Sequence, residues 1–409
     1  MSKEYKELIV GLDIGTSKVT CMVAGVGAEG SLSVIGLGTQ ATNGLKRGVV
    51  VNIEATVDAI ARVVQEAEQM ADCKIHDVFI GIAGSHIRSF NSSGTVALKE
   101  KEVSQADVER VIEVARAMPI PAEQQVLHIL TQEFIIDGQG GVREPIGMSG
   151  VRLEVKVHIV TGAVSAAQNV IKCVRRCGLE VMDLTLQPLA SSYAVLTEDE
   201  KELGVCLVDI GGGTTDIAVF AQGAIRHTAV IPVAGDQITN DIAMALRTPT
   251  AEAEDIKIQQ GVAMHSLVDP SELIEVPGVG DRQPRQLSRQ RLADVIEPRV
   301  SELFELVQAE LRRSGYEELL SSGIVLTGGS AVMRGMVDLG EEVFHLPVRI
   351  GIPQYEGDLA EIVCQPRYAN VLGLVMEGLA QRRRGIQVRE TRSVMHVFGR
   401  LRAWFERNF

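Results

Sequence analysis

Short apolar runs alternate with longer segments in which apolar residues recur every three or four positions along most of this chain. The runs at 78–83 and 205–210 have the length and composition of buried β-strands. Residues 53–70 place apolar side chains on one helical stripe, as amphipathic helices do. The same patterns predict helices at 165–177 and 291–313 and strands at 179–186 and 224–233. This alternation predicts an α/β protein with two or more domains in its 409 residues.

Residues 84–162 interrupt this alternation and predict a compact insert. A Ser-Ser-Gly sequence between apolar positions predicts a β-hairpin at 90–98, and a capping-box pattern opens a predicted helix over 104–118. Two further strands are predicted near 126–136 and 151–160. The histidines of the insert are isolated from one another and are His86, His128 and His158. With no constellation suited to catalysis, the insert is interpreted as a contact surface.

The C-terminal segment shows another pattern. In residues 393–409, apolar residues recur at i, i+3 and i+4, which predicts an amphipathic helix. These apolar residues are Val394, Val397, Phe398, Leu401, Trp404 and Phe405, and the arginines beside them include Arg400 and Arg402. Aromatic rings next to arginines are typical of a helix that lies in the plane of an anionic membrane surface. A helix docked on the body, with Trp404 in the core, is the alternative.

Charge separates this segment from the rest. The formal net charge is −13, while residues 381–409 carry eight arginines against two glutamates, a local charge of +6 that leaves −19 elsewhere. An acidic body argues against a nucleic-acid partner, and a basic tail favours an anionic one. Residues 381–392 are basic without apolar period and predict a flexible linker. No secretory signal or membrane-spanning run is predicted, and the six scattered cysteines predict reduced, buried thiols.

The candidate chemistry lies in a motif that occurs twice, at 8–20 and 205–220. Each copy is an apolar strand that ends at an aspartate (Asp13 or Asp209), a turn rich in Gly and Thr, and a returning strand. Glycine allows backbone N–H groups to approach a phosphate closely, hydroxyls add donors, and an aspartate can hold Mg²⁺ through water. Two copies in one chain therefore predict a polyphosphate site.

A third element completes the pattern. Residues 324–335 read as a strand, a Gly-Gly-Ser turn and the start of a helix, which permits close backbone approach to a ligand. Two phosphate elements followed by such a turn resemble the superfamily of actin, Hsp70 and the sugar kinases. Residues 187–192 and 368–374 are similar to the helices that connect the two lobes in that superfamily.

Over its whole length the chain resembles the FtsA family of actin-like bacterial cell-division proteins. The resemblance adds the segment 44–50, the position of the insert, and the basic linker with its terminal helix to the three motifs. It implies a two-lobed actin-like ATPase fold with an inserted 1C subdomain and ATP in the cleft. The implied divisions are subdomain 1A at 1–83, 163–191 and 366–380, 1C at 84–162, 2A at 192–234 and 305–365, 2B at 235–304, the linker at 381–392 and the membrane helix at 393–409.

The resemblance also implies roles for individual residues. The phosphates would be gripped by Gly15, Thr16, Ser17, Gly211, Gly212, Gly213, Thr214 and Thr215, and Mg²⁺ would be held through water by Asp13 and Asp209. The nucleoside would be contacted by Gly235, Glu254, Lys257, Gly328, Gly329 and Ser330. The register leaves open whether Lys18 points into the cleft. No motif fixes a catalytic base, which leaves the rate of ATP hydrolysis open.

In function, the resemblance implies an ATP-binding scaffold that tethers FtsZ filaments of the Z ring to the cytoplasmic face of the inner membrane at the division site. Implied partners are the C-terminal tail of FtsZ, further copies of this chain in filaments, later division proteins and the anionic membrane surface. The tail of FtsZ is expected on subdomain 2B, and Arg289, Arg291 and Arg299 are a candidate basic surface for it.

Three other functions share parts of the pattern. A sugar or acid kinase has the same hairpins, but a terminal membrane helix does not serve its chemistry. An Hsp70-type chaperone needs a substrate domain after Gly373, where only 36 residues remain. The pilus-assembly relatives of FtsA share the insert and are the nearest alternative, although an Arg-rich tail with a tryptophan is not expected in them.

Overall fold

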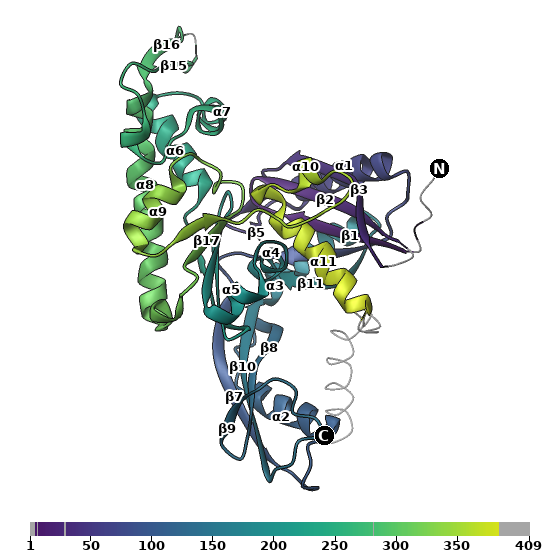
Figure 1. Ribbon diagram of the computed structural model, residues 1–409. Coiled ribbons are helices and arrows are strands. Elements are labelled where there is room, and N and C mark those ends of the chain that lie inside the picture. Colours follow the sequence, from purple (N-terminus) through teal and green to yellow (C-terminus); the bar gives the residue numbers. More distant parts are fainter. Residues whose placement is uncertain (1–4, 6, 28–29, 281, 384–409) are drawn as a thin grey trace.

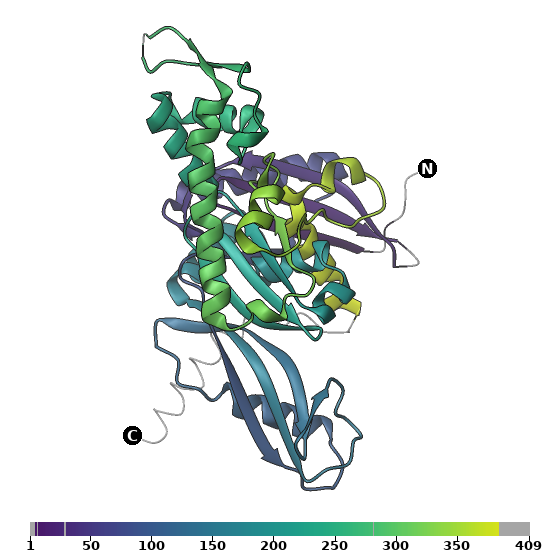
Figure 2. The same ribbon diagram turned by 60° about the vertical axis from the view of Figure 1, so that its left-hand side comes forward.

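The computed structural model describes residues 5, 7–27, 30–280 and 282–383. They form two lobes, each built on a five-stranded sheet, and an insert with a four-stranded sheet of its own (Figure 1). A second view shows the helical end of lobe 2 and the insert at opposite ends of the molecule (Figure 2). The predicted α/β class and the predicted inserted subdomain are therefore confirmed.

Lobe 1 has the strand order β11-β6-β1-β2-β3. Its strands are β1 (Glu7–Ile14), β2 (Lys18–Val26), β3 (Leu32–Ala41), β6 (Asp77–Ile82) and β11 (Glu180–Leu186), and a two-stranded ladder of β4 (Leu45–Lys46) and β5 (Val49–Val50) lies beside them. Because side chains alternate along a strand, Val10 and Leu12 pack with helices α1 (Ile53–Ala71) and α3 (Val164–Arg176) on one face. Ile9 on β1 belongs to a second core on the opposite face.

Lobe 2 has the strand order β14-β13-β12-β17-β18. Its strands are β12 (Val205–Ile210), β13 (Thr215–Ala221), β14 (Ala224–Ile231), β17 (Ile324–Thr327) and β18 (Val348–Ile350). Its other elements are α6 (Gly235–Leu246), α7 (Thr250–Gln260), η1 (His265–Leu267), β15 (Leu273–Val276), β16 (Arg285–Ser288), α8 (Arg289–Ser314), η2 (Glu317–Leu319) and α9 (Met336–Phe344). Val208 and Ile210 pack with Ile238 of α6 and Leu303 of α8 in one core. The predicted helix at 291–313 is confirmed as α8, with Pro298 inside it.

The insert has the strand order β7-β10-β8-β9 and one helix on the sheet. Its elements are β7 (Arg88–Ala97), α2 (Gln105–Arg116), β8 (Gln124–Ile136), β9 (Gln139–Val142) and β10 (Arg152–Ala163). The predicted hairpin at 90–98 is wrong, because β7 is one continuous strand that pairs with β10. Gly94 serves close packing here: a Cβ atom at this position would collide with the Val111 carbonyl oxygen of α2.

Two helices, α4 (Gln187–Val195) and α11 (Ala369–Arg383), connect the lobes and pack against each other. Short elements beside them are α5 (Glu198–Leu203), α10 (Ala360–Val363) and η3 (Pro366–Tyr368). Residues 381–383 differ from the predicted linker, because they form the last turn of α11. The Gln381 amide donates to Asp183 Oδ2 (2.7 Å), and Arg382 donates to the Leu8 carbonyl (3.0 Å), so contacts with lobe 1 hold this turn in place.

Candidate functional site

The two predicted phosphate hairpins face each other across the junction of the lobes. In lobe 1, the Gly15 N–H donates to the Lys18 carbonyl (2.9 Å), and in lobe 2 the Gly211 N–H donates to the Thr214 carbonyl (3.0 Å). A Cβ atom at Gly213 would lie 2.6 Å from Thr16 Oγ1, and one at Gly212 would lie 2.7 Å from Ser17 Oγ. The fold therefore brings the two turns, almost two hundred positions apart in the sequence, into contact through glycine.

The aspartates at the strand ends are held by the connecting helices. The Gln187 amide of α4 and the Asn370 amide of α11 both donate to Asp13 Oδ1, at 2.9 and 3.1 Å. The Ser191 hydroxyl of α4 donates to Asp209 Oδ2 at 2.7 Å. These three partners were not among the predicted site residues, and their signal was weak, because a polar residue on a connecting helix has no fixed spacing from the aspartate it contacts.

A third carboxyl group, that of Asp216, lies in the same region. Burial raises the pKa of Asp13 to about 7 and the pKa of Asp216 to about 8, and the charge of Asp209 adds to both shifts. Asp216 accepts from Thr214 Oγ1 (3.0 Å), while its buried Oδ1 has no hydrogen-bond partner among the described residues. Buried carboxylates without enough positive charge nearby favour a cation.

Mg²⁺ fits this set of donors. It prefers oxygen ligands and usually keeps several waters, so it needs few direct protein contacts. Within the described ranges, no three His, Cys, Asp or Glu side chains lie close enough together to hold an ion directly. Contact of Asp13 and Asp209 with Mg²⁺ through water stays a prediction.

Lys18 lies beside the two aspartates at the junction of the lobes. Its ammonium group donates to the Arg367 carbonyl of η3 at 2.7 Å and lies 4.9 Å from the centre of the Tyr368 ring. Burial lowers the pKa of Lys18 to about 8, while Asp13 and Asp209 oppose that shift. The side chain therefore provides positive charge beside both aspartates, a placement that the sequence left open.

The predicted nucleoside turn lies against the second hairpin. Ser330 Oγ donates to the Gly211 carbonyl (3.0 Å), and the Gly235 N–H donates to the same oxygen (3.1 Å). Gly328 has a φ of +89°, a conformation that glycine adopts without strain. A Cβ atom at Gly329 would meet nothing within 4 Å, so this glycine borders open space. Gly235, Gly328, Gly329 and Ser330 are thus brought together beside the second hairpin.

Three of the predicted residues, Lys257, Glu254 and Thr215, form hydrogen bonds within the protein. The Lys257 ammonium donates to the Gly235 carbonyl (3.2 Å), to Thr239 Oγ1 (2.8 Å) and to Glu254 Oε2 (2.7 Å). It is 7% exposed, whereas the side chain of Glu254 is 42% exposed. Thr215 is fully buried and its hydroxyl donates to the Val233 carbonyl (2.8 Å). The Thr215 hydroxyl therefore supports the fold and is not free for a ligand.

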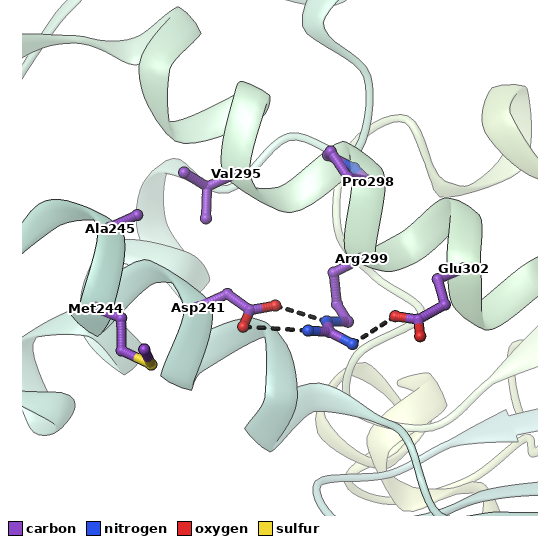
Figure 3. Close-up of a pocket in the computed structure, with 7 residues that line it drawn as sticks. All are labelled: Asp241, Met244, Ala245, Val295, Pro298, Arg299 and Glu302. Atoms are coloured by element: carbon purple, nitrogen blue, oxygen red, sulfur yellow. Dashed lines mark hydrogen bonds and ion pairs between the residues drawn. The ribbon is translucent and has the colours of Figure 1, made fainter.

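A separate pocket of about 500 Å³ lies between α6 and α8 of lobe 2 (Figure 3). Its lining residues are Asp241, Met244, Ala245, Val295, Pro298, Arg299 and Glu302. The Arg299 guanidinium lies at its centre, paired with both oxygens of Asp241 (2.5 and 3.2 Å) and with Glu302. Of the three arginines proposed for a peptide surface, only Arg299 lines it. Arg289 pairs instead with Glu272 (2.6 Å), and Arg291 is exposed outside the pocket.

The predicted membrane residues lie outside the described residues, since the structure describes the chain only to residue 383. They are Val397, Phe398, Arg400, Leu401, Arg402, Trp404 and Phe405. Among the helices of the described ranges, none has the length and apolar character needed to cross a bilayer.

The fold and the paired hairpins define a protein of the actin-like ATPase class. Two solved structures agree: the PilM-PilN type IV pilus biogenesis complex (TM-score 0.67, 18% identity, 91% of this chain and 98% of that one), and MreB5 of Spiroplasma citri bound to ADP (TM-score 0.54, 18% identity, 93% and 97%). At such identity they show the fold alone.

Sequence comparison places the chain within this class. The profile described as "Cell division protein FtsA" matches residues 206–373, and the one described as "SHS2 domain inserted in FTSA" matches residues 84–161. The cell division protein FtsA of Pseudomonas aeruginosa is 60% identical over 415 residues, which cover 100% of both chains. The chain belongs to the FtsA family of cell division proteins. Membership confirms the predicted resemblance. The chain is therefore assigned to this family and not to the sugar or acid kinases, the Hsp70-type chaperones or the pilus-assembly proteins.

Proposed function

We propose that this protein is a scaffold of the division septum that binds ATP with Mg²⁺ between its lobes and ties FtsZ filaments to the cytoplasmic membrane. The observation that supports nucleotide binding best is the contact of Gly212 and Gly213 with the opposite hairpin, beside three buried carboxyl groups. An MreB relative of the same fold is bound to ADP in its solved structure.

In this proposal the two turns enclose the phosphates. Backbone N–H groups of Gly212 and Gly213 would face them, and the hydroxyls of Thr16 and Ser17 would add donors, whereas the N–H groups of Gly15 and Gly211 and the Thr214 hydroxyl donate within the protein. Asp13 and Asp209, oriented by the connecting helices, would bind the waters of Mg²⁺. When bound, the anionic phosphates of ATP would face the positive charge of Lys18, and Mg²⁺ would face the buried carboxyl groups. Gly235, Glu254, Lys257, Gly328, Gly329 and Ser330 would surround the nucleoside.

ATP binding, with little turnover, is proposed as the working state. Hydrolysis needs a base within hydrogen-bond reach of an attacking water. Asp13 and Asp209 already accept hydrogen bonds from Gln187, Asn370 and Ser191, which hold them in place as metal-binding groups. The high pKa of Asp216 leaves it largely protonated near neutral pH. Slow hydrolysis is therefore expected.

The pocket between α6 and α8 is proposed as the receptor for the C-terminal tail of FtsZ. Short peptides commonly bind in helix-lined grooves through apolar anchors and a few charges. Met244, which is 79% exposed, and Val295 supply apolar surface, while Arg299, Asp241 and Glu302 supply both signs of charge. Of the three arginines predicted to form the peptide-binding surface, this proposal keeps only Arg299.

The remaining parts of the proposal concern assembly and location. Residues 393–409 would bind the cytoplasmic face of the inner membrane at the division site, joined to the body through 384–392. Head-to-tail contacts between actin-like bodies would form filaments, since a heterologous contact propagates openly. The insert, with its own core and no catalytic groups, is proposed as the surface for self-association and for later division proteins.

Thermal melting as a function of Mg-ATP concentration tests the central claim. A ligand that binds only the folded state increases the free energy of unfolding by RT ln(1 + [L]/Kd), so the melting temperature rises with ligand concentration. The wild type and Asp199→Asn, which changes an exposed carboxyl group on α5, should respond equally. Asp209→Asn should lose most of the response. An unchanged wild-type melting temperature at millimolar ATP would remove the nucleotide assignment while leaving family membership intact.

A further inference from the structure

Two positively charged side chains lie near one tyrosine ring at the junction of the lobes. The Lys18 ammonium group is 4.9 Å from the centre of the Tyr368 ring, and the central guanidinium carbon of Arg367 is 5.4 Å from the same point. Lys18 begins β2 of lobe 1, whereas Arg367 and Tyr368 belong to η3. Two cations that are 349 positions apart in the sequence are therefore neighbours in the fold.

Neither cation has a carboxylate partner within ion-pair distance in the described part of the chain. Burial is the main cause of the lowered pKa of Lys18, and repulsion from Arg367 lowers it further, while Asp13 and Asp209 oppose the shift. The two positive charges are thus close enough to repel each other. The Tyr368 ring attracts both cations, but an aromatic ring has no net charge with which to neutralise them.

Contacts from both lobes hold the backbone of η3 in place. The Pro366 carbonyl accepts from the Gly328 N–H of lobe 2 (3.3 Å), and the Arg367 carbonyl accepts from the Lys18 ammonium group of lobe 1 (2.7 Å). Tyr368 is 7% exposed, whereas Arg367 is exposed. The ring and the backbone are therefore fixed, and the Arg367 guanidinium remains accessible to a ligand from solution.

The two cations also lie beside two elements of the proposed nucleotide site. Lys18 follows the phosphate hairpin of lobe 1, where its carbonyl accepts from the Gly15 N–H (2.9 Å). The residue before Arg367 is hydrogen-bonded to Gly328 of the Gly-Gly-Ser turn. Phosphates held at the hairpin would lie near Lys18, and Arg367 adds a second positive charge on the side of the nucleoside turn.

Phosphate oxygens suit this pair of side chains. The planar guanidinium group of arginine can donate two parallel hydrogen bonds to a phosphate, and the ammonium group of lysine binds it as a point charge. Two like charges without a counter-ion repel each other, and an anion that contacts both replaces this repulsion with attraction. The arrangement therefore favours an anion of the phosphate class over a neutral ligand.

We propose that Lys18 and Arg367 form an anion site for phosphate oxygens, in which Arg367 binds the ligand and Tyr368 positions both cations. The inference rests on the proposed function for the source of these oxygens, which is the phosphate chain of the bound nucleotide. Free inorganic phosphate has the same chemistry and is the other source to be tested.

Isothermal titration calorimetry on the full-length protein, at constant ionic strength, tests this with Mg-ATP, adenosine and inorganic phosphate. Arg367→Gln removes the charge and keeps the backbone carbonyl that accepts from Lys18. Its affinity for Mg-ATP should fall roughly tenfold, while its affinity for adenosine should not change. Arg367→Lys keeps the charge and should retain most of the affinity. Arg291→Gln, at another exposed arginine, is the matched control and should bind all three as the wild type does.

The other outcomes separate the two sources from failure of the proposal. If Arg367→Gln loses binding of inorganic phosphate but keeps its affinity for Mg-ATP, the anion site stands and free phosphate is its ligand. Unchanged affinities for both would overturn the site. An equal loss of affinity for adenosine, or a lower melting temperature of ligand-free Arg367→Gln, would mean that Arg367 supports the fold and would overturn it too. If the wild type binds no Mg-ATP, the proposed function fails, and the titrations with inorganic phosphate alone decide on the anion site.

Discussion

Gly373 of α11 packs directly on the backbone of Ala190 in α4. A Cβ atom at Gly373 would collide with the Ala190 carbonyl oxygen, so the two helices cross at this point with no side chain between them. The same helices carry Gln187, Ser191 and Asn370, which orient the two cleft aspartates. The position of the crossing therefore fixes the position of the site.

Gly373→Ala should destabilise the protein, because the new methyl group must push the helices apart. Overpacking of a tight core contact typically costs about 1–3 kcal/mol, and the backbone carbonyl at this site cannot rotate away. We expect a loss of at least about 2 kcal/mol in the free energy of unfolding, measured by urea denaturation. A cost below roughly 0.5 kcal/mol would show that the crossing relaxes easily.

Gly329→Ala should behave differently from Gly373→Ala, since a Cβ atom at Gly329 meets nothing within 4 Å. The free energy of unfolding should stay within about 0.5 kcal/mol of the wild type, as at other uncrowded positions. If Gly329 allows close approach of the nucleoside, the affinity for ATP should fall by roughly tenfold, which is about 1.4 kcal/mol. Isothermal titration calorimetry with ATP measures this affinity. Unaltered affinity would place the nucleoside elsewhere.

Local motifs could be predicted from the sequence, whereas contacts between distant residues could not. The two hairpins and the Gly-Gly-Ser turn were recognisable because each is local, with its aspartate and glycines within a few positions. The partners of Asp13 were not, since Gln187 and Asn370 are far from it in the sequence. Gly94 was misinterpreted as a turn because its reason is non-local too, a helix packed on its strand.

The raised pKa values of Asp13 (about 7) and Asp216 (about 8) predict that these two groups contribute less to the stability of the ligand-free protein as pH rises from about 5.5 to about 7.5. In this window both carboxyl groups have ionised in the unfolded chain, whereas in the folded chain Asp13 loses its proton only around pH 7 and Asp216 only around pH 8. The unfolded state then binds fewer protons, so stability falls with pH. Urea denaturation at several pH values measures the slope, and Asp216→Asn should reduce it. An Asp216→Asn variant with the same slope as the wild type would contradict the raised pKa of Asp216.

Binding of Mg²⁺ should oppose this loss of stability at higher pH, because a cation binds the ionised carboxyl groups. Affinity for Mg-ATP should therefore increase from about pH 6 to about pH 8, with release of protons on binding. Titration calorimetry in two buffers of different ionisation enthalpy measures the protons released. Binding that releases no protons at pH 6.5 would mean that the buried carboxyl groups do not face the metal.

The pocket between α6 and α8 predicts a difference between two arginines that lie on the same helix. Arg299→Glu would replace the guanidinium group by a third carboxyl group beside those of Asp241 and Glu302. It should weaken binding of a labelled FtsZ tail peptide by roughly tenfold or more. Arg291→Glu, which changes charge equally outside the pocket, should leave the affinity unchanged. Met244→Ala, at a 79% exposed position, should also weaken binding without disturbing the fold. Equal affinities in all three variants would remove this pocket from consideration.

Residues 393–409 should anchor the protein reversibly to the membrane. Burying Val397, Phe398, Leu401, Trp404 and Phe405 contributes about 25 cal/mol per Å² of apolar surface, and each nearby arginine adds about 1 kcal/mol on anionic lipid. Truncation after Gly385 leaves α11 complete, including Arg382 on the Leu8 carbonyl, so ATP binding should persist while sedimentation with anionic liposomes is lost.

Point variants separate the apolar contribution from the electrostatic one. Trp404→Glu should weaken sedimentation strongly, whereas high salt should reduce wild-type binding only in part, because salt screens the arginines but not the apolar contacts. Arg392→Gln, in the linker, is the matched control and should have a small effect. If the truncated protein still sediments with the liposomes, the tail is not the anchor. The alternative of a docked helix, with Trp404 in the core of the body, would then be the better account, and truncation should in that case also lower the melting temperature.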